Sequence, residues 1–409
     1  MKKISVRGGN RLCGEISVSG SKNAALPIIF ACILTNGVSE IENLPDIGDV
    51  RVALSLLTSF GATVRKENNL TFIDTTNLSY SAPDVNSVSA IRASTYLIGS
   101  CLSRFGRCPI MKFGGCNFSS RPIDMHLEAC FRLGARAEGE LLLCNRLIGN
   151  EIVFDKASVG ATVNALLLSA SAEGETVIKG CAVEPHIDAL IAFLVSCGAE
   201  ISRRGRELHI VGKQLHSGKI KIIGDMIEAG SYLALSLMCG GGIRVLNAPI
   251  SDMQAVIESL KNLGADISVD KSGCLSLSLG EANYLDIVAT PYPGFPTDLQ
   301  PVFAPLMAYC NGGKITDTVW QNRFGYLSGL SNFGVKSTLG NNSATIYKSN
   351  IHNGSFVAPD LRGGMAGLLC ALCSTGQSEI YSAETILRGY EKLEEKLRSV
   401  GAEIKIVNH

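Results

Sequence analysis

One feature constrains the fold of this chain more than any other: a helix-ending glycine that recurs at nearly constant spacing. Six times, an amphipathic segment ends in an apolar residue followed by Gly and a small residue, and then continues into a strand-like stretch. The six glycines are Gly61, Gly134, Gly198, Gly264, Gly334 and Gly401, with gaps of 73, 64, 66, 70 and 67 residues. Because glycine adopts the left-handed conformation that ends many helices, the pattern predicts six repeats of about 68 residues.

Each repeat also contains a second, more apolar helix that is rich in Ala, Leu and Ser and is followed by another glycine. The clear examples are residues 23–34, 162–172, 230–238, 300–310 and 363–373. Because these helices are apolar nearly all round, we expect them to be buried, whereas a charged, amphipathic helix such as 387–400 should face solvent. The repeats therefore predict an α/β fold with two pseudo-symmetric domains of about 200 residues, each with three repeats around buried helices.

The composition excludes several classes of protein. The 409 residues include 37 Lys and Arg and 37 Asp and Glu, so the net charge is zero, and 46% of them are hydrophobic. Such a chain is not disordered, can bury a large core and lacks the basic surplus of a general nucleic-acid binder. No apolar run reaches about 18 residues, so no membrane-spanning helix is expected. The first seven residues are typical of a strand rather than of a signal peptide.

The 14 cysteines are too dilute to indicate a disulfide scaffold. Most lie in apolar runs, as Cys32, Cys101 and Cys239 do, and we expect them to be reduced and buried. Cys370 and Cys373 have the C-x-x-C spacing, but no second Cys or His pair is placed to complete a zinc site. A reducing cytoplasm is the simplest inference.

Charged residues gather where the buried helices begin. The cations are Lys22, Arg92, Lys156 and Arg362, and the acids are Asp155, Asp225, Glu228, Asp298 and Asp360. A helix N-terminus carries partial positive charge and free N–H groups, so a cation placed there is unfavourable unless an anion joins it. If these helix starts face one cleft, we expect that cleft to bind a polyanionic ligand. Alternatively, each is a surface charge beside a helix cap.

Two further residues have a structural and a functional interpretation. Cys116 lies in a polar loop, 113–122, where neighbouring cations would favour the nucleophilic thiolate; alternatively, it is a loop cysteine without a role. Asp298, in Pro296-Thr297-Asp298, could cap the following helix or act as a general base.

These residues resemble the enolpyruvyl transferases of the EPSP synthase superfamily. The resemblance begins with Gly20-Ser21-Lys22-Asn23-Ala24-Ala25 and the Gly114-Gly115-Cys116 loop. Further matching segments follow in order: Arg121-Pro122-Ile123-Asp124, Ser158-Val159-Gly160-Ala161-Thr162, Phe295-Pro296-Thr297-Asp298, Asn322-Arg323-Phe324, Asp360-Leu361-Arg362 and Arg388-Gly389-Tyr390. The resemblance covers the whole chain. The Cys loop points to the branch that acts on UDP-N-acetylglucosamine, because the branch that acts on shikimate 3-phosphate lacks it.

The resemblance implies a two-domain inside-out α/β barrel built from the six repeats. Residues 21–223 would form the first domain, with the Cys loop, and residues 1–20 and 224–409 the second, with the active site in the interdomain cleft. The implied reaction transfers the enolpyruvyl group of phosphoenolpyruvate to the 3-hydroxyl of UDP-N-acetylglucosamine and releases phosphate. This is the first committed step of peptidoglycan precursor synthesis, a cytoplasmic reaction that needs no metal or organic cofactor. The expected partners are these small molecules, not nucleic acid or a membrane.

The resemblance also implies roles for individual residues. Lys22, Arg121 and Arg388 would hold the phosphate of phosphoenolpyruvate, with Arg92 nearby, and Arg323 and Arg362 would hold its carboxylate. Cys116 would deliver a proton to C3 and can also form a covalent adduct at C2, while Asp298 would take the proton of the sugar hydroxyl. Lys22 and Arg388 are thereby counted with Cys116 and Asp298 as catalytic. The UDP-sugar would contact Asn23, Arg121, Pro122, Ile123, Asp124, Met125, Lys156, Ser158, Val159, Gly160, Asp298 and Val319.

Several positions depart from the family's usual pattern. The departures are His186, Met226, Tyr292, Gln321 and Gly363. They leave the reaction core intact but raise two alternatives: an enolpyruvyl transferase with another nucleotide acceptor in a specialised pathway, and a binding protein that has lost turnover.

Overall fold

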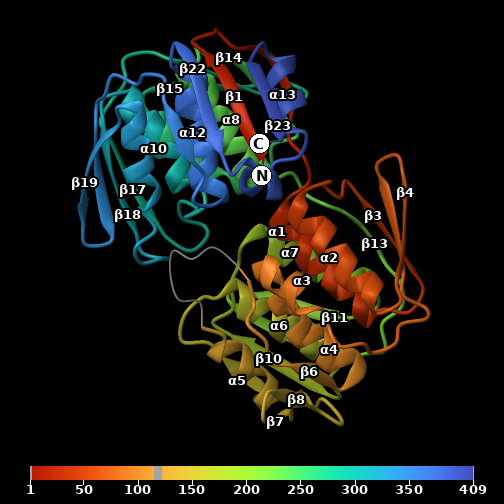
Figure 1. Cartoon of the computed structure of the whole chain (residues 1–409). Coiled ribbons are helices and arrows are strands. Elements are labelled where there is room, and N and C mark those ends of the chain that lie inside the picture. Colours follow the sequence, from red (N-terminus) through yellow and green to blue (C-terminus); the bar gives the residue numbers. More distant parts are fainter. Residues whose placement is uncertain (1, 115–121, 409) are drawn as a thin grey trace. The chain divides into compact units, whose positions relative to one another are not determined.

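The computed structural model describes residues 2–114 and 122–408 and divides into two compact units (Figure 1). Unit 1 contains Met1–Ser19 and Gly224–His409, and unit 2 contains Gly20–Ile223. Each unit has its own hydrophobic core. The start of the chain thus contributes strands to the unit that is otherwise built from its second half.

Three four-stranded sheets are described in unit 1. In order, their strands are β21 (Ser355–Val357), β22 (Gly376–Tyr381), β1 (Lys2–Gly8) and β23 (Glu403–Asn408); β2 (Cys13–Ser17), β14 (Gly242–Leu246), β16 (Leu275–Leu279) and β15 (Ala265–Val269); and β17 (Leu285–Ala289), β18 (Gly313–Asp317), β20 (Ser343–Tyr347) and β19 (Lys336–Gly340). In this order, each sheet has one parallel pair followed by two antiparallel pairs. The predicted N-terminal strand is confirmed as β1.

Unit 2 also has three described sheets, and two of them repeat this pairing. The strands are β9 (Glu151–Val153), β10 (Glu175–Lys179), β12 (Glu207–Val211) and β11 (Glu200–Arg204); β13 (Lys219–Lys221), β3 (Val38–Glu42), β5 (Leu70–Asp74) and β4 (Thr63–Glu67); and β6 (Arg107–Pro109), β8 (Leu141–Leu143) and β7 (Arg136–Glu138). The last sheet has three strands, and both of its pairs are antiparallel.

The predicted buried helices are confirmed, with ends shifted by up to four residues. Unit 1 has α8 (Met226–Met238), α10 (Gln300–Tyr309) and α12 (Leu361–Cys373); unit 2 has α1 (Lys22–Ala31), extended by the turn η1 (Cys32–Leu34), α4 (Leu97–Phe105) after η2 (Arg92–Tyr96), and α6 (Val159–Ser169). In α8, every residue from Ile227 to Met238 is buried. An all-round apolar surface is therefore matched by all-round contact with the core.

The remaining helices cover the sheets and mostly bury a single face. They are α2 (Gly48–Ser59), α3 (Val85–Ala90), α5 (Asp124–Arg132), α7 (Pro185–Ser196), η3 (Ile250–Asp252), α9 (Gln254–Leu263), α11 (Tyr326–Leu330), η4 (Ser331–Phe333), η5 (Ala383–Arg388) and α13 (Leu393–Ser399). The prediction of one helix over 387–400 is wrong. The turn η5 ends at Arg388, and α13 begins only after Lys392, whose φ of 47° lies in the left-handed region.

The six recurrent glycines all have the conformation that the sequence predicts. Their φ angles lie between 81° and 104°, in the region that only glycine adopts without strain. Each therefore allows a helix to end and the chain to continue directly into the next strand.

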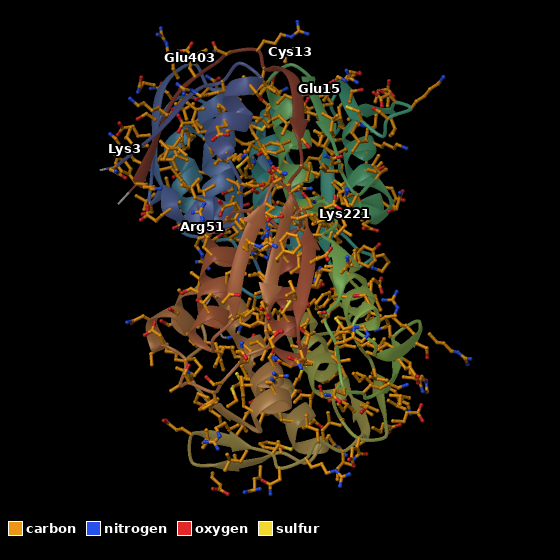
Figure 2. All side chains as sticks on the ribbon, turned by 90° about the vertical axis from the view of Figure 1, so that its right-hand side faces the viewer. Lys3, Cys13, Glu15, Arg51, Lys221 and Glu403 are labelled. Atoms are coloured by element: carbon orange, nitrogen blue, oxygen red, sulfur yellow. The ribbon has the colours of Figure 1, made fainter. Side chains whose placement is uncertain are left out.

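The described cysteines are mostly buried, as expected for those in apolar runs. Cys13 on β2 is exposed, as Figure 2 shows, and the sequence analysis did not single it out. Cys373 is half-buried, and Cys116 lies outside the described residues. Within residues 2–114 and 122–408, no helix combines the length and the apolar character needed to cross a membrane.

Candidate active site

A cluster of charged side chains in unit 1 is centred on Asp298. Nη2 of Arg323 donates to Asp298 Oδ1 at 2.8 Å. Nε and Nη2 of Arg362 donate to Asp298 Oδ2 at 3.3 and 3.2 Å. Both arginine side chains are almost completely buried, with exposures of 5% and 2%, whereas that of Asp298 is 29% exposed. The structure therefore brings together three residues that the sequence analysis assigned to one reaction.

The position of Asp298 excludes the interpretation that it caps a helix. The following helix, α10, has Leu299 at its N-cap and receives no side-chain cap. Instead, Asp298 faces Arg323, whose Nη1 also donates to Thr297 Oγ1 at 2.9 Å. The backbone carbonyl of Arg323 accepts a hydrogen bond from Gln300 Nε2 at 3.2 Å. The start of α10 thus fixes both partners of the ion pair.

Arg362 is held at the first turn of α12. The N-cap residue, Asp360, accepts hydrogen bonds from the N–H groups of Arg362 and Gly363, both at 2.9 Å. The guanidinium lies 5.5 Å from the ring centroid of Tyr390, and its Nη1 is buried without a hydrogen-bond partner among the described residues. Burial alone would lower the pKa of Arg362, but Tyr390, Asp298 and Asp225 outweigh it and raise the pKa above its ordinary value. Arg362 therefore stays charged and has a donor available.

A hydrogen bond within unit 1 holds the side chain of Tyr390 in place. Its hydroxyl lies 2.7 Å from Ser231 Oγ, and Ser231 Oγ donates to the carbonyl of Ile227. Because the single Ser231 proton is used in that bond, Tyr390 is the donor to Ser231. Burial raises the pKa of Tyr390, so its hydroxyl keeps this proton at neutral pH. Arg388, two residues earlier at the end of η5, is half-buried.

Two acids at the start of α8 have structural roles, but both are buried and are not the surface charges of the alternative interpretation. Asp225 caps α8 by accepting from the N–H groups of Ile227 and Glu228 at 2.8 and 3.1 Å. Glu228 pairs with Lys396 at 2.6 Å, and its pKa is raised by burial against the effect of Lys396. Val319 lies in unit 1 as well, where its N–H donates to Asp317 at 2.9 Å.

In unit 2, Lys22 is the first residue of α1 and Asn23 is the second. Lys22 Nζ lies 3.3 Å from Asp49 Oδ2 in the first turn of α2, and both side chains are largely buried. Sequence reasoning missed Asp49, because nothing in the local pattern distinguishes it from an ordinary helix-start acid. The ion pair holds the ammonium group at the N-terminus of an apolar helix.

Residues predicted to contact the UDP-sugar lie at the start of α6. Ser158 is its N-cap and accepts from the N–H of Ala161 at 3.3 Å. Val159 and Gly160 are half-buried, and Lys156 is exposed. Residues 122–125, which are also predicted to contact the UDP-sugar, lie at the start of α5, and Arg92 begins η2. Arg121 and Cys116 lie outside the described residues.

Two buried polar residues of unit 2 escaped the sequence analysis. His126 on α5 is 5% exposed, and its Nδ1 lies 2.7 Å from Nδ2 of Asn164, a fully buried residue of α6. Burial, together with the nearby charge of Arg92, lowers the pKa of His126 to about 4. The available signal was Asn164 itself, because a buried amide within an apolar helix must have hydrogen-bond partners.

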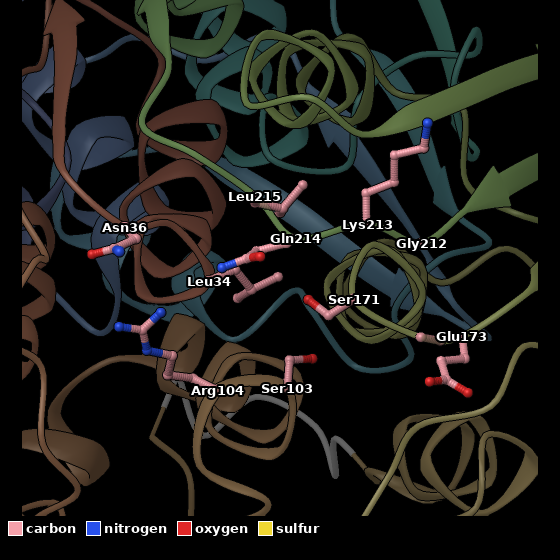
Figure 3. Close-up of a pocket in the computed structure, with 11 residues that line it drawn as sticks. Leu34, Asn36, Ser103, Arg104, Ser171, Glu173, Gly212, Lys213, Gln214 and Leu215 are labelled. Atoms are coloured by element: carbon pink, nitrogen blue, oxygen red, sulfur yellow. The ribbon is translucent and has the colours of Figure 1, made fainter.

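A cavity of about 430 Å³ lies in another part of unit 2 (Figure 3). It is lined by residues at the C-terminal ends of α4 and α6, including Arg104 and Ser171, and by the segment from Gly212 to Leu215. None of the predicted site residues lines it. Among the described residues, no group of three or more His, Cys, Asp or Glu is placed to hold a metal ion.

Comparison with known proteins decides the family. The profile described as EPSP synthase (3-phosphoshikimate 1-carboxyvinyltransferase) matches residues 6–397. The chain belongs to this family. UDP-N-acetylglucosamine 1-carboxyvinyltransferase from Prosthecochloris aestuarii is 38% identical over 420 residues, covering 100% of this chain and 99% of that protein. The protein of the same name from Halothermothrix orenii is 37% identical over 414 residues, covering 100% of both. The chain is thus an enolpyruvyl (1-carboxyvinyl) transferase.

Solved structures share its mixed α/β fold. The enolpyruvyl transferase NikO from Streptomyces tendae superposes with a TM-score of 0.89 at 23% identity, covering 100% of this chain and 99% of that one. EPSP synthase from Acinetobacter baumannii gives a TM-score of 0.76 at 19% identity and covers 100% of both chains. At these identities, the likeness shows a shared fold alone.

Proposed function

We propose that this enzyme transfers the enolpyruvyl group of phosphoenolpyruvate to the 3-hydroxyl of UDP-N-acetylglucosamine, at the first committed step of peptidoglycan precursor synthesis. The observation that carries the proposal is Asp298, a partly exposed carboxylate held by the buried guanidiniums of Arg323 and Arg362. Relatives that carry this activity in their names match the whole chain at 37–38% identity and support the choice of acceptor.

In unit 1, Arg323 and Arg362 would bind the carboxylate of phosphoenolpyruvate. Planar guanidiniums suit this task because their donors match the two oxygens of a carboxylate. The buried Nη1 of Arg362 has no described partner, and a buried donor left without one costs about 1–3 kcal/mol. A substrate carboxylate would supply the missing acceptor. Arg388, near the same Tyr390, would contact the phosphate.

In unit 2, Lys22 would bind the phosphate of phosphoenolpyruvate, with Arg92 and Arg121. Asn23 would contact the sugar, and residues 121–125 would hold the uracil. Lys156 and the start of α6 would bind the diphosphate, which suits the positive end of a helix. Val319 in unit 1 would also contact the nucleotide sugar.

The reaction would proceed by addition and elimination. Cys116 would protonate C3 of phosphoenolpyruvate. At the same time, Asp298 would accept the proton of the sugar 3-hydroxyl as the hydroxyl oxygen attacks C2. The resulting tetrahedral ketal loses phosphate from C2 and a proton from C3. This elimination restores the C2–C3 double bond and gives the enol ether of the acceptor. The arginines would stabilise the charge that develops along this path, where positioned cations contribute most. No metal or organic cofactor takes part in these steps.

We also propose that units 1 and 2 are the two domains of an inside-out α/β barrel made of six repeats. Five of the six described sheets share one order of pairing, a parallel pair followed by two antiparallel pairs. The six recurrent helix-ending glycines, Gly61 to Gly401, all have positive φ and follow one another at nearly constant spacing along the chain. Both regularities support a repeat as the origin of the fold.

An enolpyruvyl transferase with a different nucleotide acceptor is the second candidate. The departures at His186, Met226, Tyr292 and Gln321 favour it. A binding protein without turnover is disfavoured, because the general-acid and general-base candidates are both retained.

Phosphate release distinguishes these functions. The purified enzyme is given phosphoenolpyruvate with UDP-N-acetylglucosamine, and in parallel with a panel of other nucleotides and sugar nucleotides. Release with UDP-N-acetylglucosamine and formation of its enolpyruvyl ether by mass spectrometry would support the proposal. Release only with another acceptor would refute the proposed acceptor, and release with none would support the binding protein.

A further inference from the structure

Two contacts fix the guanidinium of Arg362 in unit 1. Its Nε and Nη2 donate to one oxygen of Asp298, at 3.3 and 3.2 Å. Its central carbon lies 5.5 Å from the ring centroid of Tyr390, within the range of a cation–π interaction. The third nitrogen, Nη1, is buried and has no hydrogen-bond partner among the described residues. Because a guanidinium is planar and rigid, these two contacts determine where Nη1 points.

Tyr390 interacts strongly with this charge. Burial lowers the pKa of Arg362, and Tyr390 has the largest of the effects that raise it, ahead of Asp298. Tyr390 and Arg362 are 1% and 2% exposed, so water screens their interaction little. Tyr390 therefore stabilises the charged guanidinium and does more than fill the space beside it.

A buried hydrogen bond sets the orientation of the Tyr390 side chain. Its hydroxyl donates to Ser231 Oγ at 2.7 Å, since the proton of Ser231 is used by the carbonyl of Ile227. Ser231 is fully buried. Rotation of the tyrosine would leave its donor buried without an acceptor, which is unfavourable. Ser231 thus restricts Tyr390 to one place beside Arg362.

The residues that precede Arg362 and Tyr390 also pack together. A Cβ atom on Gly389 would lie 2.6 Å from Cδ2 of Leu361, a distance at which one of the two would have to shift. Leu361 is the first residue of α12 and directly precedes Arg362, and Gly389 directly precedes Tyr390. This close approach fixes the backbone on both sides of the contact between ring and guanidinium.

The helix α8 supports both contacts of the guanidinium. A Cβ atom on Gly230 would lie 2.5 Å from Cδ1 of Leu299, so the residue next to Asp298 packs against α8 at this glycine. The following residue, Ser231, holds the hydroxyl of Tyr390. Adjacent residues of one buried helix therefore contact the segment of Asp298 and the side chain of Tyr390.

We propose that Tyr390, held by Ser231, is a positioning residue that orients Arg362 so that its Nη1 donates to the carboxylate of bound phosphoenolpyruvate. The proposal rests on the proposed function, in which Arg362 binds that carboxylate. Tyr390 would act through the arginine and not by contact with the reacting atoms. An arginine that is already oriented loses less conformational freedom on binding, so its orientation contributes to the affinity for phosphoenolpyruvate. The affinity for the acceptor should not depend on it.

Four variants separate positioning from packing. Tyr390→Phe keeps the ring beside Arg362 and loses the hydroxyl, Ser231→Ala removes the acceptor of that hydroxyl, and Tyr390→Leu removes the ring. Tyr232→Phe is the matched control, because it removes a buried tyrosine hydroxyl of the same unit that donates instead to Glu228, at 3.1 Å. Thermal unfolding of each variant establishes that the enzyme in the assay is folded.

Phosphate release at saturating acceptor gives kcat and the KM for phosphoenolpyruvate. We expect Tyr390→Leu to raise this KM by roughly tenfold, and Tyr390→Phe and Ser231→Ala to raise it by roughly threefold each. The value of kcat and the KM for the acceptor should stay within about twofold of the wild type. Combining Tyr390→Phe with Ser231→Ala should add little, since both remove the same hydrogen bond. In Tyr232→Phe, the KM for phosphoenolpyruvate should be unchanged.

A purely structural role of Tyr390 gives a different result, because loss of folded enzyme lowers the apparent kcat and leaves KM unchanged. An unchanged KM for phosphoenolpyruvate in folded Tyr390→Leu, or an equal rise in Tyr232→Phe, would overturn the inference and leave the proposed function intact. If Tyr390→Leu does not fold, unchanged KM values in Tyr390→Phe and Ser231→Ala would overturn it as well. If the wild type releases phosphate only with an acceptor other than UDP-N-acetylglucosamine, the proposed acceptor fails, and the same comparison with the accepted nucleotide still tests Tyr390.

Discussion

Replacing Asp298 tests both the stability of unit 1 and the chemistry of the enzyme. Asp298→Ala removes the shared carboxylate of two arginines that are 5% and 2% exposed. Arg323 would keep its contact with Thr297, and Arg362 its position over Tyr390, but both would lose the carboxylate that they share. Asp298→Asn is the milder change, because one amide oxygen can still accept from one arginine.

The expected cost follows from the burial of the arginines. Removing one partner of a buried ion pair costs about 3–5 kcal/mol, because the charge that remains is uncompensated. The side chain of Asp298 is 29% exposed, so we expect the lower end of that range, about 3 kcal/mol for Asp298→Ala. We expect roughly 1–2 kcal/mol for Asp298→Asn, which keeps one acceptor. In a unit of about 200 residues, 3 kcal/mol corresponds to a decrease in Tm of roughly 6–12 °C.

Trp320 provides a probe of this region. It is the single tryptophan of the chain, and its backbone N–H donates to Asp317 at 3.0 Å. Asp317 in turn accepts from Thr297, the neighbour of Asp298, at 2.6 Å. Tryptophan fluorescence during thermal unfolding therefore follows unit 1. The exposed Asp286 on β17 supplies the control, and Asp286→Asn should change the free energy of unfolding by less than about 0.5 kcal/mol.

Turnover is measured on the same variants. If Asp298 is the general base, Asp298→Asn should lower the rate of phosphate release by roughly 10²-fold or more while acceptor binding stays detectable. Two results would refute the reasoning separately. Equal Tm values for Asp298→Ala and Asp286→Asn would show that the ion pairs do not stabilise unit 1. Retained turnover in Asp298→Asn would remove Asp298 as the base.

Three further predictions concern packing, reactivity and pH. Gly363→Ala should destabilise unit 1 by about 1–3 kcal/mol in urea unfolding, because its Cβ would lie 2.8 Å from Cβ of Tyr326; an unchanged midpoint would contradict this. Peptide mapping should find Cys13 modified by a brief maleimide treatment of the native enzyme, and Cys116 alkylated by the epoxide fosfomycin; an unmodified Cys116 would argue against its role. The unfolded state gains a proton on His126 as the pH falls below 6.5, but the folded state resists it until about pH 4. Folding stability should therefore fall by roughly 3 kcal/mol over that interval, and the fall should be absent in His126→Asn.

Elements with a clear physical cause in the local sequence could be predicted. The apolar helices and the glycine stops follow from side-chain periodicity and from the conformational freedom of glycine, and both were confirmed. The helix expected over 387–400 failed for a reason that periodicity does not capture. Charged and apolar residues alternate suitably there, but the chain leaves the helical conformation at Gly389 and at Lys392.

Asp298, Arg323 and Arg362 could be singled out from the sequence, but the contacts among them could not. Arg362 and Asp298 are 64 residues apart, and only the packing of α12 near the start of α10 brings them together. The sequence left open whether Asp298 is a helix cap, and the structure excludes this. His126 and Asn164 were missed because they lie 38 residues apart in the sequence, and only the fold brings their side chains into contact.

The departures from the family pattern do not carry equal weight for the choice of acceptor. Gly363 has a local reason, because Tyr326 and Pro359 occupy the space that a side chain would need, so this departure records packing within unit 1. Gln321 is exposed and lies two residues from Arg323, so packing imposes no residue there. A residue that packing does not constrain can change when the acceptor changes. This applies most to a residue that lies next to a candidate substrate-binding residue. Gln321, unlike Gly363, is therefore among the departures that bear on whether the acceptor is UDP-N-acetylglucosamine.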